Sequence, residues 1–162
     1  MGLIIHLGQV LEIKVSVNLR GTDVCVAQQL LDVAQRRAAY QQTSAPLVTR
    51  NLIVLGSAIA DNYYADNPSG VIRAFDVRTG ILRWTYNTIP QEGQFGTSTW
   101  QDRSWSFTGH APVWSLFSAD EELGLVYMPI SSSTNDMYGG HRVGDNLFSQ
   151  SIVAVNAETG AR

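Results

Sequence analysis

The clearest pattern along the chain is a series of short apolar runs separated by turn signals. Residues Leu52–Leu55 form an apolar run of the length of one buried strand. A turn cluster at Asp66–Gly70 follows, and Val71–Val77 then places apolar side chains on both faces of an extended segment. Residues Ile81–Tyr86 return after a Thr-Gly turn. Strands joined by short turns predict an antiparallel meander and argue against a βαβ unit.

The same order of elements returns towards the C-terminal end. Leu123–Pro129 is a second buried run, and Ala111–Val113 before it echoes Ala45–Leu47. Segments Val71–Gly80 and Ile152–Gly160 share the pattern apolar-x-Ala-apolar-Asp/Asn-x-x-Thr-Gly. An internal repeat of this kind predicts stacked units, because one unit alone cannot bury its apolar faces.

The turn of each repeat has a physical logic. The side chains of Asp76 and Asn156 can accept hydrogen bonds from backbone N–H groups of the turn. Gly80 and Gly160 can supply the positive φ of a tight hairpin. Trp84 follows four residues after Gly80 and is expected to wedge one sheet against the next, whereas the second copy reaches Arg162 before any such tryptophan. We therefore expect the chain to be cut within a repeat.

The first 42 residues differ from the rest. Apolar and polar side chains alternate over Leu11–Leu19, which predicts a strand, and apolar residues at helical spacing over Val26–Ala34 predict a helix. The segment lacks the basic start of a secretory signal, so we expect no signal peptide in it. The chain is thus divided into an N-terminal segment of unclear origin, 1–42, and a repeat region, 43–162.

Composition supports a β-rich chain and limits its partners. Charged residues make up 15% of the chain and there are 14 glycines, which suits strands and tight turns better than a charged helical bundle. The net charge of −3 comes with no basic stripe, so nucleic-acid binding is not expected. The single cysteine, Cys25, cannot form an internal disulfide and is expected to be a small buried hydrophobe.

One repeat resembles a known family. Residues Ala74–Trp84 resemble the tryptophan-docking motif of pyrroloquinoline-quinone (PQQ) dehydrogenases, and Gly56–Asn62 and Val113–Tyr127 resemble neighbouring segments of their glucose enzymes. Arg142–Asn146 resembles a turn of the related alcohol dehydrogenases. The resemblance covers about Tyr40 to Arg162 and implies an all-β fold, a partial β-propeller of about two four-stranded blades out of eight.

The resemblance also implies a metal site. A carboxylate after the Gly-Ser strand ligates calcium in this family, and Asp61 stands there with Asn62 beside it. Oxygen donors of this kind suit a hard cation, although an Asp-Asn pair is also common in solvated turns. Ser132 stands where the alcohol enzymes carry an asparagine ligand, and Asn135 and Asp136 could replace it only if the loop shifts.

Other residues are expected beside the cofactor. Trp114 matches the tryptophan whose ring forms the floor under PQQ, and a flat aromatic ring suits a planar quinone. The alternative for Trp114 is a core position between blades. Ser57 and His110 are further cofactor-binding candidates, with a structural role as the alternative for His110. The remaining histidines have no partner at ligand spacing, so zinc is unsupported. The family's catalytic base is expected beyond Arg162, so no catalytic residue is assigned in this chain.

The resemblance implies an oxidoreductase. The parent protein would oxidise a sugar or an alcohol, pass electrons to a membrane quinone or a cytochrome, and work in the periplasm. The chain alone is expected to be inactive, because it lacks most blades, and its open sheet edges favour self-association. Two alternatives stay open, namely a non-catalytic propeller scaffold built from the same repeat and a gene remnant. Trp100 and Trp105 either rim a substrate entrance or cover a blade edge.

Overall fold

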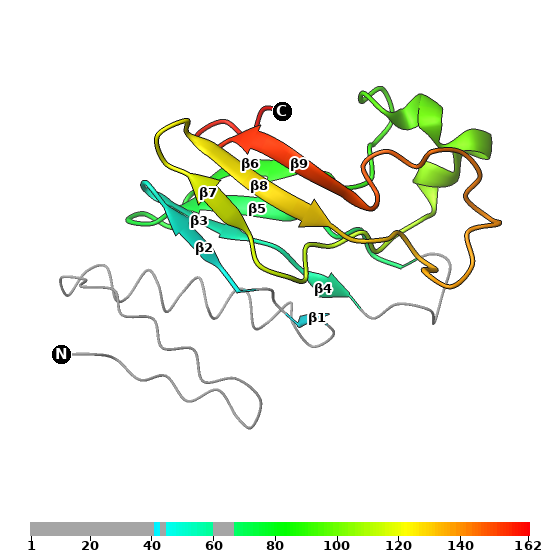
Figure 1. The fold of residues 1–162 in the computed structure, drawn as a ribbon, viewed down its shortest axis with the longest axis horizontal. Coiled ribbons are helices and arrows are strands. Elements are labelled where there is room, and N and C mark those ends of the chain that lie inside the picture. Colours follow the sequence, from blue (N-terminus) through cyan, green and yellow to red (C-terminus); the bar gives the residue numbers. More distant parts are fainter. Residues whose placement is uncertain (1–40, 43–44, 60–66) are drawn as a thin grey trace.

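The computed structural model describes residues 41–42, 45–59 and 67–162, and these are mostly β-strands. The strand and helix predicted between Leu11 and Ala34 lie outside the described residues. The strands and the two short 3-10 helices have the following bounds (Figure 1): β1 Gln41–Gln42, β2 Leu47–Thr49, β3 Leu52–Leu55, β4 Ala58–Ile59, β5 Ile72–Asp76, β6 Leu82–Tyr86, η2 Thr97–Thr99, η3 Gln101–Ser106, β7 Ser118–Asp120, β8 Leu125–Ile130 and β9 Ser151–Asn156. Within these residues, no helix is long and apolar enough to cross a membrane.

The first sheet is a four-stranded antiparallel meander in the order β2-β3-β5-β6. Its strands confirm the runs predicted at Leu52–Leu55, Val71–Val77 and Ile81–Tyr86, with each boundary within one residue. A small separate sheet joins β1 to β4. The predicted meander is therefore the observed topology.

The second sheet repeats this pattern with three strands in the order β7-β8-β9. The predicted run Leu123–Pro129 begins late, at Leu125, because the N–H of Leu123 donates 2.8 Å to the Asp120 carboxylate and holds that residue in the turn. The echo at Ala111–Val113 does not form the first strand, which is β7. Instead the N–H of Ala111 donates to the carbonyl of Ser132 at 2.9 Å, outside the sheet.

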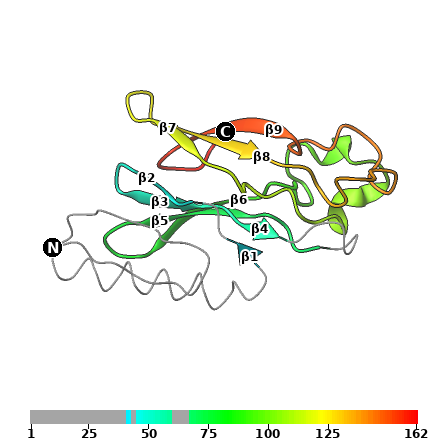
Figure 2. The same ribbon diagram turned by 60° about the horizontal axis from the view of Figure 1, so that its bottom comes forward.

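The two sheets stack face to face, with the core between them, as Figure 2 shows. The first sheet contributes the fully buried Val54, Ile72 and Ala74. The second contributes residues of the opposite parity, including the fully buried Val126 and Val155. Because aligned positions of the two repeats bury opposite faces, the sheets stack like successive blades and not as mirror images.

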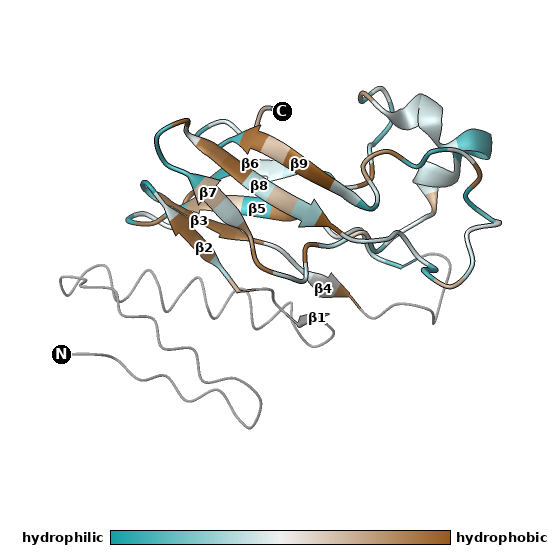
Figure 3. Cartoon of the chain, viewed as in Figure 1, coloured by the Kyte–Doolittle hydropathy of each residue, from teal (hydrophilic) through white to brown (hydrophobic). Residues whose placement is uncertain are grey.

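Each sheet also has an outer face, which points away from the core and is not covered by the other sheet. Ile152 on β9 is 77% exposed, and Val48 on β2 and Leu82 on β6 are about half exposed. The strands of both sheets are hydrophobic along much of their length, while the turns are hydrophilic (Figure 3). This explains why the sequence showed apolar residues on both faces of its strands.

Trp84 joins the two sheets in the way the docking motif predicts. Its indole Nε1 donates a hydrogen bond of 2.8 Å to the carbonyl of Ala157 in the turn after β9. Gly160 lies directly against the ring, since a Cβ there would come within 2.7 Å of Cδ2 of Trp84. The structural role predicted for Trp84 is confirmed.

The two Thr-Gly turns have matching hydrogen bonds. The carboxylate of Asp76 accepts the backbone N–H of Thr79 at 2.9 Å, and the side chain of Asn156 accepts that of Thr159 at 3.1 Å. In the first turn, the hydrogen bonds from the backbone N–H and then the hydroxyl of Thr79 lower the pKa of Asp76. Gly80 and Gly160 have φ of 70° and 68°, as the hairpins require.

Candidate cofactor site at the loop end of the sheets

The predicted site residues that the structure describes lie at one end of the two sheets. Trp114 precedes β7 and Ser132 follows β8; because β7 and β8 are antiparallel, these two positions share an end. Ser57 follows β3, and β4 beside it lies at the same side as the end of β8 (Figure 1). Asp61 and Asn62 lie outside the described residues.

His110 lies between Ser69, which leads into the first sheet, and Ser133, which follows β8 of the second sheet. We call this set of backbone contacts the layer. The backbone of His110 pairs with Ser69 on one side and with Ser133 on the other. Its N–H donates to the carbonyl of Pro68 at 2.8 Å, and its own carbonyl accepts the N–H of Gly70 at 2.6 Å. The imidazole Nδ1 lies 2.8 Å from the carbonyl of Ser132, so it carries the proton and donates. His110 and Ser132, predicted separately, are therefore in direct contact.

Two glycines allow this layer to close. A Cβ on Gly70 would come 2.5 Å from Cα of Pro112, and one on Gly109 would overlap the carbonyl oxygen of Asn67. Both neighbours are backbone atoms, which cannot rotate away. The segment that begins at Asn67 is thus pressed against the segment that leads to Trp114.

Trp114 is available to a planar ligand. Its side chain is 64% exposed, in contrast to the buried Trp84 and Trp100. An exposed aromatic ring at the mouth of a loop cluster can stack on a flat ring system. This exposure is compatible with the predicted cofactor floor and also with the alternative, a core position against a further blade, so both stay predictions.

Two hydroxyl groups near the predicted metal loop have no hydrogen-bond partner in the described structure. Ser57 is buried, and its Oγ is shielded from solvent and unbonded, as is Oγ of Ser69. Buried polar atoms are normally hydrogen-bonded. These two serines precede and follow Asp61 and Asn62 in the sequence, and unsatisfied hydroxyls also occur at other buried positions, such as Thr88 and Ser104.

Ser132 fits a metal less well. Its Oγ donates to the carbonyl of Ser133 at 3.1 Å and accepts from Nη2 of Arg142 at 3.4 Å. Its carbonyl accepts from Ala111 and His110. Among the described residues, no group of three or more His, Cys, Asp or Glu could hold a metal ion.

The two connecting tryptophans have different roles. Trp100 is 2% exposed, and its Nε1 donates 2.7 Å to the carbonyl of Leu147, so it covers the end of the second sheet. Trp105 is half-buried, with the guanidinium of Arg103 5.6 Å from its ring centre. Of the two alternatives predicted for these residues, Trp100 follows the structural one.

The contacts of the Arg142–Asn146 turn could not be read from the sequence. The motif resembled a turn of the family, but its sequence did not indicate which residues the turn contacts. In the structure, a Cβ on Gly144 would overlap the carbonyl oxygen of Thr99, and the N–H of Asn146 donates to that oxygen at 3.2 Å. The turn is thereby seated on η2 while Arg142 points its guanidinium at the loop of Ser132.

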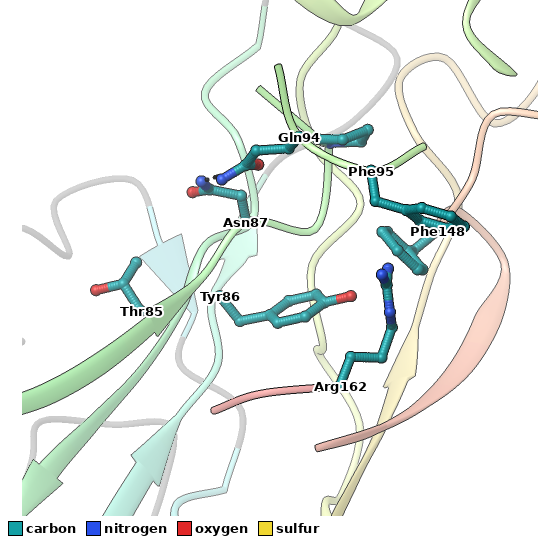
Figure 4. A pocket seen from close by; sticks show the side chains of 8 residues that line it. Thr85, Tyr86, Asn87, Gln94, Phe95, Phe148 and Arg162 are labelled. Atoms are coloured by element: carbon teal, nitrogen blue, oxygen red, sulfur yellow. Dashed lines mark hydrogen bonds between the residues drawn. The ribbon is translucent and has the colours of Figure 1, made fainter. Parts of the chain in front are cut away.

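A cavity of about 270 Å³ lies at the junction of the sheets, away from these residues (Figure 4). The guanidinium of Arg162 packs 4.3 Å from the ring centre of Phe95 and 4.7 Å from that of Phe148. Tyr86 contacts Phe148 edge to face, with ring centres 5.8 Å apart. Neither Trp114 nor Ser57 lines this cavity, so it is separate from the candidate cofactor site.

Tyr86 makes the stability of the folded chain sensitive to high pH. Burial raises the pKa of Tyr86 to about 12, although the nearby Arg162 works against the shift. The pKa is higher in the folded than in the unfolded state, so the stabilisation is complete below about pH 10 and is lost as pH rises through about 12. After allowance for solvent screening we expect a loss of about 1–2 kcal/mol over this window.

Ultraviolet difference titration of the phenolate tests this expectation. The wild-type protein should show one tyrosine that ionises near pH 12 and is missing from Tyr86→Phe. If both proteins titrate alike, with every tyrosine near pH 10, the burial of this hydroxyl has no energetic consequence.

Comparison with known proteins places this geometry in a family. The family model described as the β-propeller domain of glucose, ethanol and alcohol dehydrogenases with PQQ matches residues 20–162. The quinate/shikimate dehydrogenase (quinone) of Acinetobacter baylyi is 38% identical over 122 residues, with 75% of this chain and 15% of that protein covered. The quinoprotein glucose dehydrogenase of Escherichia coli is 36% identical over 130 residues, at the same coverage.

A solved structure agrees with the stacking of the sheets. A europium-containing methanol dehydrogenase matches with a TM-score of 0.61 and 25% identity, over 73% of this chain and 23% of that one. The chain thus spans about a seventh of the length of the curated relatives cited above. Its repeated antiparallel sheets, its docked tryptophan and its family match agree, and the chain belongs to the PQQ β-propeller family of glucose, ethanol and alcohol dehydrogenases.

Proposed function

We propose that this chain is a portion of a PQQ-dependent dehydrogenase that oxidises a sugar or an alcohol. The observation that carries the proposal is the exposed ring of Trp114, which lies at the same end as the buried, unbonded hydroxyl of Ser57. The relatives support it, since their names include quinate/shikimate, glucose and methanol dehydrogenases. PQQ is the cofactor of this family.

Asp61 and Asn62 would hold a calcium ion beside the quinone. Their oxygens suit this hard cation, and Ser57 and Ser69, whose hydroxyls are unbonded, precede and follow them in the sequence. When bound, the ion would polarise the quinone as a Lewis acid. The residues of this chain would contribute by orienting the cofactor: Trp114 would stack on its ring, and the layer around His110 would hold the metal loop in place.

The rest of the reaction is assigned to the longer protein. The group that takes the alcohol proton is expected outside these 162 residues, so the chain alone should bind PQQ weakly and not turn over substrate. The electron acceptor is a membrane quinone or a cytochrome, and the name of the Acinetobacter relative includes a quinone. A periplasmic location goes with this assignment.

The test is Asp61→Asn in the longer protein that contains this chain. We expect calcium-dependent retention of PQQ to weaken at least about tenfold, because the substitution removes the charged metal ligand. Asp102→Asn, at an exposed carboxylate of η3, is the matched control and should retain PQQ like the wild type. Equal retention by Asp61→Asn and the control would favour a non-catalytic scaffold. Tight stoichiometric binding of PQQ by the 162-residue chain would show that the remaining blades are not needed.

A further inference from the structure

The turns at one end of the sheets give the two repeats opposite charge. Leu52 pairs with Asp76 where β3 begins and β5 ends, and Leu125 pairs with Asn156 at the matching place in the second sheet. These positions are therefore equivalent in the two repeats. In each sheet, the turn between the first two strands and the turn after the third strand lie at this end, opposite the candidate cofactor site.

The first sheet is basic in both of these turns, and the second sheet is acidic in both. Arg50 lies in the turn between β2 and β3, and Arg78 lies in the turn after β5. Glu121 and Glu122 lie in the turn between β7 and β8. Glu158 lies in the turn after β9, at the position equivalent to Arg78. All five residues are exposed, so successive repeats present charges of opposite sign to solvent.

Within the chain, this difference places an ion pair across the junction of the sheets. The guanidinium of Arg50 donates from Nη1 to Oε1 of Glu158 at 3.0 Å and from Nη2 to the carbonyl of Glu121 at 2.8 Å. Gly124 lies against the same group, since a Cβ there would come 2.9 Å from Nη2. The turn between the first two strands of one sheet therefore contacts the turn after the third strand of the next sheet.

Two of these charges have no opposite charge beside them. The side chains of Arg78 and Glu122 form no ion pair with any residue that the structure describes. Glu122 lies in the turn that corresponds to that of Arg50, which contacts the following sheet, and Arg78 corresponds to Glu158, which contacts the preceding sheet. By this equivalence, Glu122 serves the outer side of the second sheet and Arg78 serves the outer side of the first.

The outer faces beside these two charges are apolar. Val48 on the first sheet is 50% exposed, and Ile152 on the second sheet is 77% exposed. Apolar strand surface of this kind gains free energy when another surface covers it. Each face thus combines exposed apolar side chains with one unpaired charge at its end, and the two charges are of opposite sign.

We propose that two copies of this chain bind head to tail, with the outer face of the second sheet of one copy on the outer face of the first sheet of the next. Glu122 of one copy then lies beside Arg78 of the other. The two contact surfaces differ, so the arrangement is heterologous and can add further copies. The alternative pairings of two first sheets or two second sheets bring like charges together, which is unfavourable. The proposal does not depend on the proposed function.

Sedimentation velocity of the 162-residue chain tests the proposal. We expect oligomers whose fraction rises with protein concentration and falls at high salt, because salt screens exposed charges. Arg78→Glu and Glu122→Arg should each raise the dissociation constant at least about tenfold, because like charges then meet at the contact. Circular dichroism that matches the wild type shows that each variant is folded.

An equimolar mixture of the two variants separates the ion pair from a general effect of charge. Association should return in the mixture, because the two reversed charges then face each other and the two native charges do likewise. Glu92→Arg and Arg103→Glu are the matched controls, since they make the same changes of net charge at an exposed pair after β6. Both should associate like the wild type.

Three results would overturn the proposal. The first is a wild-type chain that stays monomeric at about 1 mM, the range of the weakest specific complexes. The second is association that neither Arg78→Glu nor Glu122→Arg weakens, as expected if exposed strand edges pair instead. The third is a mixture of the two variants that associates no better than either one alone.

Discussion

Trp84→Ala is expected to lower the free energy of unfolding by about 3–5 kcal/mol. The side chain is 7% exposed and fills the space between the first sheet and the turn after β9. Its removal leaves a cavity and deprives the carbonyl of Ala157 of the Nε1 donor. Since domains of this size are stable by about 5–15 kcal/mol, this change removes a large fraction of the total.

Urea unfolding followed by circular dichroism measures this loss. Trp84→Phe keeps a ring but not the N–H, so its loss should be smaller by about the contribution of one hydrogen bond and part of the packing. Trp105→Ala is the comparison, because its half-buried ring packs only against the edge of the core and should cost less than the loss of Trp84. A Trp84→Ala variant within about 1 kcal/mol of the wild type would mean that the sheets are held together by other contacts.

Gly109→Ala is the second substitution with a large expected effect, a loss of about 3 kcal/mol or more. The new Cβ would overlap the carbonyl oxygen of Asn67, a backbone atom that can move only if the layer opens. The N–H of Thr134, which donates to the carbonyl of Gly109, should then lose protection from exchange.

Gly93→Ala separates the overlap from backbone strain. Gly93 has φ of 77°, and a Cβ there would have nothing within 4 Å. This variant should lose about 1–2 kcal/mol from the left-handed conformation alone. Denaturant unfolding of both variants gives the comparison, and a Gly109→Ala protein no less stable than Gly93→Ala would contradict the close approach.

The strands and the docked tryptophan could be predicted because their signals are local and occur twice. The pattern around Asp76 and Gly80 returns at Asn156 and Gly160, and each copy makes the same turn with the same hydrogen bonds. Alternation of apolar residues then places the strands between the turns. The echo of Ala45–Leu47 at Ala111–Val113 was misleading, because the first strand of the second sheet begins only at Ser118.

The candidate site could be predicted only in part, because its contacts join residues far apart in the chain. The resemblance indicated Trp114 and Ser132, and His110 was a candidate from its place four residues before Trp114. The bond between His110 and Ser132 depends on the layer that crosses the sheets. Thr134 gave no signal, since a threonine in a serine-rich loop looks like any solvated residue. Its role comes from the amide of Asn67, 67 positions earlier in the chain.

The dependence of Trp84 on Gly160 has a consequence for how such a chain can change by duplication or deletion. The ring belongs to one repeat and the glycine that admits it belongs to the next. A gene rearrangement that cuts between the two sheets separates the tryptophan from the glycine that it packs against, even though each sheet is left whole. Repeats can therefore be exchanged only where the new neighbours supply both the tryptophan and the glycine. The contact between two blades is thus constrained together with the blades themselves.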